Sequence, residues 1–107
     1  MLMYESTEVL YIMKKTFKNS NTDFLVRCIM QLKTEEECYN FFEDLCTLPE
    51  FHSMAQRCVV AKMLTEKKVY NDIVAETGAS TATISRVNRS LQYGEGGYDI
   101  VFERLEK

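Results

Sequence analysis

The amino-acid sequence predicts an all-α protein with a single domain. The chain has 107 residues, and single domains cluster at about 100 to 150 residues, so a second core has no room. It contains one proline and four glycines, three of them in one short segment, which favours helices over a series of tight β-turns. With 46% hydrophobic and 27% charged residues, the composition is that of a globular protein and excludes a disordered chain.

Apolar residues at helical spacing predict three helices in the first part of the chain. An amphipathic helix over Thr7–Lys18 is either a mobile arm or a helix that wraps around a dimer partner. Asp23 is a candidate N-cap for a second helix that extends to about Leu32. Thr34 and Glu37 have the spacing of a capping box and begin a third helix. The apolar face of this third helix, which we expect to be buried, consists of Cys38, Phe41, Phe42, Leu45 and Cys46.

A long central helix follows over Pro49–Glu66. Thr47 and Glu50 repeat the capping-box spacing, and a proline in the first turn costs no hydrogen bond. Between Cys58 and Leu64 only Lys62 is polar, so the helix should be packed on several sides. A monomer of this size buries only about two thirds of its surface, so some of these contacts could come from a second subunit.

The cysteines and the apolar segments bear on the cellular compartment. Cysteines 28, 38, 46 and 58 form no CxxC pair and fall within apolar helical patterns, which predicts reduced core residues rather than a zinc site or a disulfide framework. No apolar run approaches the ~20 residues that span a bilayer, and Glu5 and Glu8 stand where a signal peptide is basic. We therefore expect a soluble, cytoplasmic protein without a membrane partner.

The charge of the chain is unevenly distributed. The net charge of -3 divides into five basic and nine acidic residues over 1–50, which gives -4, and eight and seven over 51–107, which gives +1. From Thr77 to Gly94 there is no acidic residue, whereas Arg86 and Arg89 are present. Such a face can meet phosphate, although an ordinary solvated surface is the alternative.

The segment Tyr70–Leu91 has the pattern of a helix, a tight turn and a second helix. Gly78 supplies the left-handed residue that a compact turn requires, and Ser80 can cap the second helix. Apolar residues on both sides of the turn can hold two helices at a steep angle. These apolar residues are Ile73, Val74, Ile84, Val87 and Leu91.

The outer face of the second helix carries small, hydroxyl and arginine side chains and no acid. Small residues allow close approach to base edges in the major groove, and arginines bind guanine or phosphate. This combination favours a helix-turn-helix that binds double-stranded DNA over a simple αα-hairpin. The candidate DNA-binding residues are Lys67, Lys68, Ser80, Thr81, Ala82, Ser85, Arg86 and Arg89.

The string GASTATISRVNRSL resembles the helix-turn-helix of the tryptophan repressor family. LKTEEECYNFFEDLCTLPE, MAQRCVVAKML and YGEGGY resemble the YerC/YecD branch of that family. The resemblance implies an intertwined all-α homodimer with one helix-turn-helix per subunit, at 70–91, and a role as a transcription regulator, most simply a repressor. It places a Trp repressor-like domain at 23–107, after an N-terminal helix or arm at 1–22.

The resemblance also locates an effector pocket that departs from the family pattern. Arg86 and Ser90 match two residues that hold the corepressor of the tryptophan repressor. A third residue, an arginine there, falls at Gln56, with Arg57 beside it, and Val87 replaces a glycine. The loss of a charge and the added bulk predict that L-tryptophan is not the effector, and no cofactor is expected.

Two other classes of function are the alternatives to DNA binding. A helical protein-interaction or oligomerisation module would keep the fold without reading DNA. An enzyme would need a nucleophile, a base and an orienting group, and the sole histidine, His52, has no motif-linked partner, so neither a catalytic nor a metal site is predicted. YGEGGY lacks the strand and the GK[ST] of a phosphate loop and is interpreted as a hinge before a last helix over Tyr98–Leu105.

Overall fold

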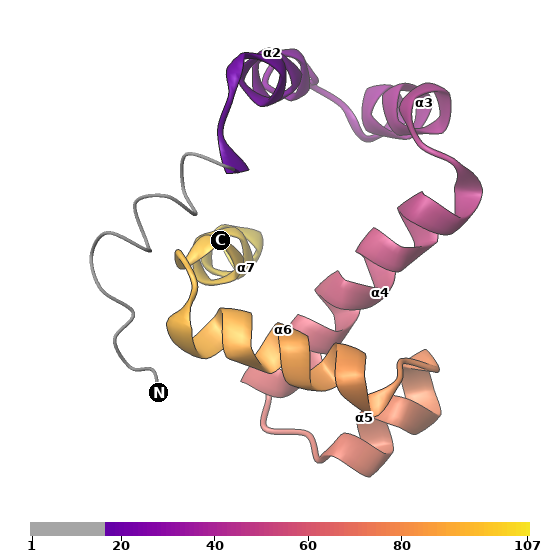
Figure 1. The fold of residues 1–107 in the computed structure, drawn as a ribbon, viewed down its shortest axis with the longest axis vertical. Coiled ribbons are helices and arrows are strands. Elements are labelled where there is room, and N and C mark those ends of the chain that lie inside the picture. Colours follow the sequence, from indigo (N-terminus) through magenta and orange to yellow (C-terminus); the bar gives the residue numbers. More distant parts are fainter. Residues whose placement is uncertain (1–16) are drawn as a thin grey trace. The chain divides into compact units, whose positions relative to one another are not determined.

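A computed structural model describes residues 17–107 (Figure 1). Its regular elements in this range are all helices, which confirms the predicted all-α class. The helix predicted over Thr7–Lys18 lies outside the described residues except for its last two positions. The helices are α2 (Ser20–Ile29), α3 (Glu35–Leu45), α4 (Leu48–Thr65), α5 (Tyr70–Thr77), α6 (Thr81–Tyr93) and α7 (Gly97–Leu105).

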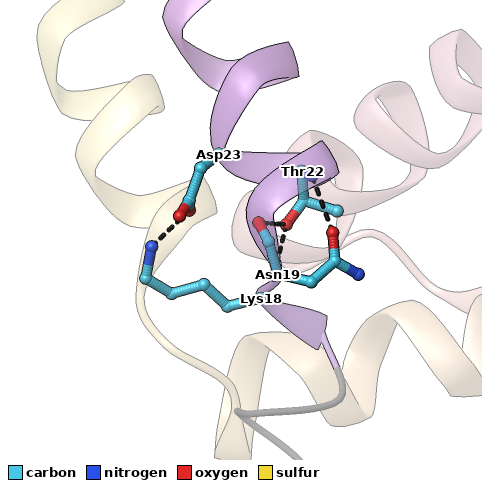
Figure 2. A network of polar contacts seen from close by, with 4 residues as sticks. All are labelled: Lys18, Asn19, Thr22 and Asp23. Atoms are coloured by element: carbon cyan, nitrogen blue, oxygen red, sulfur yellow. Dashed lines mark hydrogen bonds and ion pairs between the residues drawn. The ribbon is translucent and has the colours of Figure 1, made fainter.

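The chain divides into two compact units, the second of which begins at Phe42. In the first unit, α2 begins with a reciprocal cap that Figure 2 shows. The Asn19 side chain accepts a hydrogen bond of 2.9 Å from the Thr22 backbone N–H, and the Thr22 hydroxyl oxygen accepts one of 2.8 Å from the Asn19 N–H. Two of the four orphan N–H groups at the helix start are thereby satisfied.

The expectation that Asp23 caps this helix is therefore wrong. The polar run from Asn19 to Thr22 supplies the cap and the first turn itself. Asp23 lies in that first turn, where its negative charge complements the helix dipole, and it pairs with Lys18 (Figure 2).

The predicted start of α3 is confirmed, but its apolar face is not buried. The Thr34 hydroxyl accepts from the Glu37 N–H at 3.1 Å, while the Glu37 carboxylate accepts from the N–H of Lys33, one residue before the expected position. No residue of α2 or α3 is buried in the described chain, and Cys38 and Leu45 are exposed. The helical period establishes which residues share a face, but it does not establish what covers that face.

The core lies in the second unit, where α6 runs across α4 and α5 lies next to the start of α6 (Figure 1). The helix α4 begins with the predicted capping box between Thr47 and Glu50 and carries its proline in the first turn. The helix was predicted to be packed on several sides, but in this chain it is packed on one side only. Cys58 and Val59, on its other faces, are exposed. The buried core consists of Val60, Ala61, Met63, Ile73, Ala79, Ile84 and Val87.

The helix α7 packs on the core through Tyr98 and Phe102, and Lys62 of α4 adds polar contacts to this end of the chain. The ammonium group of Lys62 lies 5.3 Å from the centroid of the Phe102 ring and 3.1 Å from Glu106 Oε2. Phe102 stacks on Tyr98 at 5.9 Å between ring centroids. The predicted last helix is thus confirmed, with its start one residue earlier, at Gly97.

The four cysteines are free thiols, as predicted, but they are not all core residues. Cys28 and Cys46 are partly buried, whereas Cys38 and Cys58 are exposed, which corrects the expectation for these two. In the described part of the chain, no group of histidine, cysteine and carboxylate side chains could hold a metal ion. In the same residues, no helix is long and apolar enough to cross a membrane.

Candidate nucleic-acid interface

The second unit contains a helix-turn-helix made by α5 and α6. The helix α5 ends at Gly78, whose φ of 72° is left-handed, and the Gly78 N–H donates to the Val74 carbonyl over 2.9 Å. The helix α6 begins after Ser80, whose side chain accepts a hydrogen bond of 3.1 Å from the Thr83 N–H. The turn therefore has the glycine and the cap that the sequence predicts.

Side-chain hydrogen bonds fix the conformation of the turn. The Thr77 hydroxyl donates to the Ile73 carbonyl over 2.7 Å and accepts from the Ala79 N–H over 3.1 Å. From α4, the Gln56 Nε2 donates to the Thr77 carbonyl oxygen over 3.0 Å. The end of α5 and the first residues of the turn are thus bonded both to each other and to α4.

Apolar contacts hold the inner face of α6 against the rest of the unit. Ile73, Ile84 and Val87 are buried and belong to one cluster, and Leu91 packs against it. Val74 was expected to share this role but is 37% exposed, so α5 anchors the pair through Ile73. One face of α6 is therefore buried in the core.

The outer face of α6 is open. Ala82, Ser85, Arg86 and Arg89 are exposed, and at 100° per residue they fall within a sector about 100° wide, opposite the buried stripe. Thr81, in the first turn, is also exposed. The exposed face carries two positive charges and no negative one, which suits contact with a polyanion.

Ser80 differs from the other candidate contacts because its hydroxyl is engaged within the protein. Besides accepting from the Thr83 N–H, it donates to Thr83 Oγ1 over 3.1 Å. A serine hydroxyl has one hydrogen to donate, and phosphate oxygens only accept. A hydrogen bond from Ser80 to phosphate would require this internal one to break.

Lys67 and Lys68 lie between α4 and α5, on a different segment from the other candidates. Both are exposed. Lys67 has a left-handed φ of 66°, and its N–H donates to the Leu64 carbonyl over 3.0 Å. The two lysines therefore stand on a tightly turned connection that precedes the helix-turn-helix.

The four residues predicted for an effector pocket do not line one cavity. Ser90 lines a cavity of about 570 Å³ beside α7, and Arg57 lines another of about 510 Å³ near the start of α4. Arg86 is exposed on the outer face, and Gln56 is engaged with Thr77. Val87, at the position where the resembling repressor has glycine, is only 2% exposed and fills core space.

Sequence reasoning missed the part that Thr77 and Gln56 take in the turn. A threonine just before a helix-ending glycine is a recognisable signal, because its hydroxyl can bond the carbonyl four residues earlier. The Gln56 contact joins residues 21 positions apart and leaves no local pattern. Only the packing of α5 on α4 reveals it.

Comparison with known proteins agrees with this architecture. The Trp repressor protein family matches residues 20–106. The uncharacterized protein YerC of Bacillus subtilis (strain 168) is 50% identical over 90 residues, which are 84% of this chain and 86% of YerC. A TrpR-like protein from Eubacterium eligens has a crystal structure that matches with a TM-score of 0.83 and 55% identity, over 86% of this chain and 95% of that one.

A second solved structure gives the same result. It is a candidate Trp repressor from Staphylococcus aureus, with a TM-score of 0.82 and 46% identity over 86% of this chain and 92% of that one. The family match spans the helix-turn-helix and the helices that support it. The chain therefore belongs to the Trp repressor family.

Proposed function

We propose that this protein is a sequence-specific, double-stranded DNA-binding transcription regulator, acting as a repressor, that inserts α6 into the major groove. The observation that carries the proposal is the outer face of α6, which is exposed, free of acid, and composed of small residues and two arginines. Arginine can bind guanine through two hydrogen bonds, and an alanine methyl can contact the methyl group of thymine. Family membership supports the same class of function.

Within this proposal the residues have different tasks. The base edges and the flanking phosphates are contacted by the outer face of α6, which consists of Ala82, Ser85, Arg86 and Arg89. Thr81, at the start of the helix, lies next to the sugar-phosphate backbone of the DNA. Lys67 and Lys68 contact phosphate and add affinity without sequence preference. Ser80 contributes mainly by capping α6, since its hydroxyl hydrogen is used internally.

We further propose that the protein acts as an intertwined homodimer. Large apolar side chains are exposed on α4 and α7, including Val59, Val101 and Leu105. A second copy of the chain would cover such side chains and bring two copies of α6 to one duplex. A monomer that stays fully folded at micromolar concentration in analytical sedimentation would contradict the dimer.

The proposed effector behaviour departs from that of the resembling repressor. Val87 fills the space where a ligand ring would lie, and Gln56 carries no charge for a carboxylate. We infer that DNA binding requires neither L-tryptophan nor another cofactor. A regulator that binds bacterial DNA must be in the compartment that contains the DNA. We therefore propose a cytoplasmic location.

The test is selection of bound duplexes from a random library, followed by titration of the enriched sequence. We expect a roughly palindromic site with half-sites about 34 Å apart. Arg86→Ala and Arg89→Ala should each lower affinity about tenfold or more, whereas Arg104→Ala, at an exposed residue of α7, should leave it unchanged. The logarithm of affinity should fall by about 0.9 per neutralised phosphate for each tenfold rise in salt.

The same experiment separates DNA reading from a protein-interaction module. An interaction module would enrich no duplex and would tolerate both arginine substitutions. Enrichment of a palindrome together with loss of binding in the arginine variants supports the proposed function, and absence of both contradicts it.

A further inference from the structure

One side-chain hydrogen bond links α4 to the last residue of α5. The Gln56 Nε2 donates to the Thr77 carbonyl oxygen over 3.0 Å, in a partly buried position. The last four carbonyl groups of a helix have no partner within the helix, so a donor from another element is needed to satisfy them away from water. Gln56 supplies that donor to α5.

The same threonine also controls the turn that follows. Its hydroxyl bonds the Ile73 carbonyl behind it and the Ala79 N–H ahead of it. Ala79 is buried, and α6 begins two residues later, at Thr81. A displacement of Thr77 would therefore displace Ala79 and, with it, the start of α6.

Apolar packing alone leaves some freedom in the position of α6. The contacts of Ile84 and Val87 with the core are non-directional and roughly proportional to the area buried, so they do not by themselves align the polar groups of the turn. A hydrogen bond weakens steeply when its length or angle changes. The bonds through Gln56 and Thr77 therefore define the register of the turn more sharply than the core does.

From this geometry we infer that Gln56 is a positioning residue that sets the orientation of α6 for DNA without an effector. The inference rests on the proposed function. Gln56 occupies the place at which the resemblance predicted an effector contact, and its amide is used by the protein's own backbone instead. The helix-turn-helix is thereby held in one arrangement by a bond built into the fold.

The test uses the full-length chain with Gln56→Met, which keeps a similar length and removes the donor. We expect the Ala79 amide to lose hydrogen-exchange protection and the affinity for the selected duplex to fall about tenfold, while the protein stays folded by circular dichroism. Gln56→Lys restores a donor and should restore the protection of Ala79.

A matched control distinguishes positioning from general stability. Phe102→Leu weakens the packing of α7 on the core and leaves the turn untouched. It should lower the free energy of unfolding without changing DNA affinity or the protection of Ala79. Equal loss of affinity in Phe102→Leu and Gln56→Met would overturn the inference, as would an unchanged Ala79 amide in Gln56→Met.

The two hypotheses fail in different ways. If the wild-type chain enriches no duplex, the proposed function is contradicted, and the exchange of Ala79 still reports whether Gln56 holds the turn. If the wild-type chain binds and Gln56→Met binds equally well, the proposed function stands and the positioning role is wrong.

Discussion

The backbone N–H of Lys68 donates a hydrogen bond of 3.1 Å to the carbonyl oxygen of Met63, which closes the end of α4 around Lys67. With the bond from the Lys67 N–H to Leu64, this is the pair of bonds of a Schellman motif. The residue in the left-handed conformation of that motif is usually glycine, because a Cβ there is disfavoured. Here it is Lys67, with a φ of 66°.

Replacing Lys67 by glycine should therefore separate stability from DNA binding. A left-handed non-glycine residue costs about 1 kcal/mol, so Lys67→Gly should raise the free energy of unfolding by roughly 0.5 to 1 kcal/mol. The same change removes a proposed phosphate contact and should reduce the salt slope of DNA binding by about one. Urea unfolding and titration at several salt concentrations measure the two effects.

Lys67→Ala provides the control for this prediction. Alanine removes the charge but keeps the strained conformation, so affinity should fall as in Lys67→Gly without the gain in stability. Stability that rises equally in both variants would show that the left-handed φ is not the cause. An unchanged salt slope in both variants would show that Lys67 does not contact the phosphates of the DNA.

The glycines after α6 should respond in opposite ways to the addition of a methyl group. A Cβ at Gly94 would lie 2.4 Å from the Ser90 backbone oxygen, which cannot move without disturbing α6, whereas a Cβ at Gly97 meets nothing within 4 Å. Gly94→Ala should cost about 1 to 3 kcal/mol. Gly97→Ala should be neutral or stabilising by about 0.5 kcal/mol, since Gly97 begins α7. Chemical denaturation of both variants tests this, and similar losses in the two would contradict it.

The capping box of α4 gives a pH-dependent contribution to stability. The Thr47 backbone N–H donates to Glu50 Oε1 over 2.8 Å, and this bond, with one from the Thr47 side chain, lowers the pKa of Glu50 below its ordinary value of 4.5. A carboxyl group whose pKa is lower in the folded state stabilises the fold above its unfolded pKa. That stabilisation is lost as the pH falls through the lower, folded pKa.

We therefore expect Glu50→Gln to reduce the loss of stability on acidification. Glutamine keeps an acceptor for the Thr47 N–H but cannot titrate. The difference in the free energy of unfolding between pH 7 and pH 3 should be smaller for Glu50→Gln than for the wild type. Glu76→Gln, at a residue outside the capping box, should keep the wild-type difference, and identical behaviour of the two variants would refute the assignment.

The sequence predicted the elements whose signals are local. The capping box of α4, the left-handed Gly78 and the apolar period of α6 involve residues only a few positions apart, and the structure confirms each of them. The cap of α2 was misplaced because Asn19 and Asp23 are both good caps, and the choice depends on whether Thr22 can reciprocate.

Long-range and one-sided features could not be predicted in the same way. The Gln56–Thr77 bond depends on how α4 and α5 pack, and a sequence pattern carries no such distance. The exposure of Cys38 and Cys58 was missed because an apolar spacing identifies a face without identifying its partner. The outer face of α6 was predicted as exposed because its side chains are small or charged and its opposite face is apolar.

The last prediction concerns Val87 and L-tryptophan. Val87 is 2% exposed among core residues of α4 and α5, so Val87→Gly should cost about 3 kcal/mol, roughly 2 for the lost side chain and about 1 for glycine within a helix. Ser85→Gly, on the exposed face of the same helix, should cost less than about 1 kcal/mol.

The space that Val87→Gly opens in the core should not create a tryptophan site, because Gln56 remains uncharged and bonded to Thr77. Calorimetric titration should show no saturable heat for the wild type or for Val87→Gly, and DNA affinity should be the same with and without tryptophan. Micromolar binding of tryptophan by the wild type, with stronger DNA binding, would make this chain a tryptophan-responsive regulator, whereas binding by Val87→Gly alone would show that the valine side chain is the only barrier.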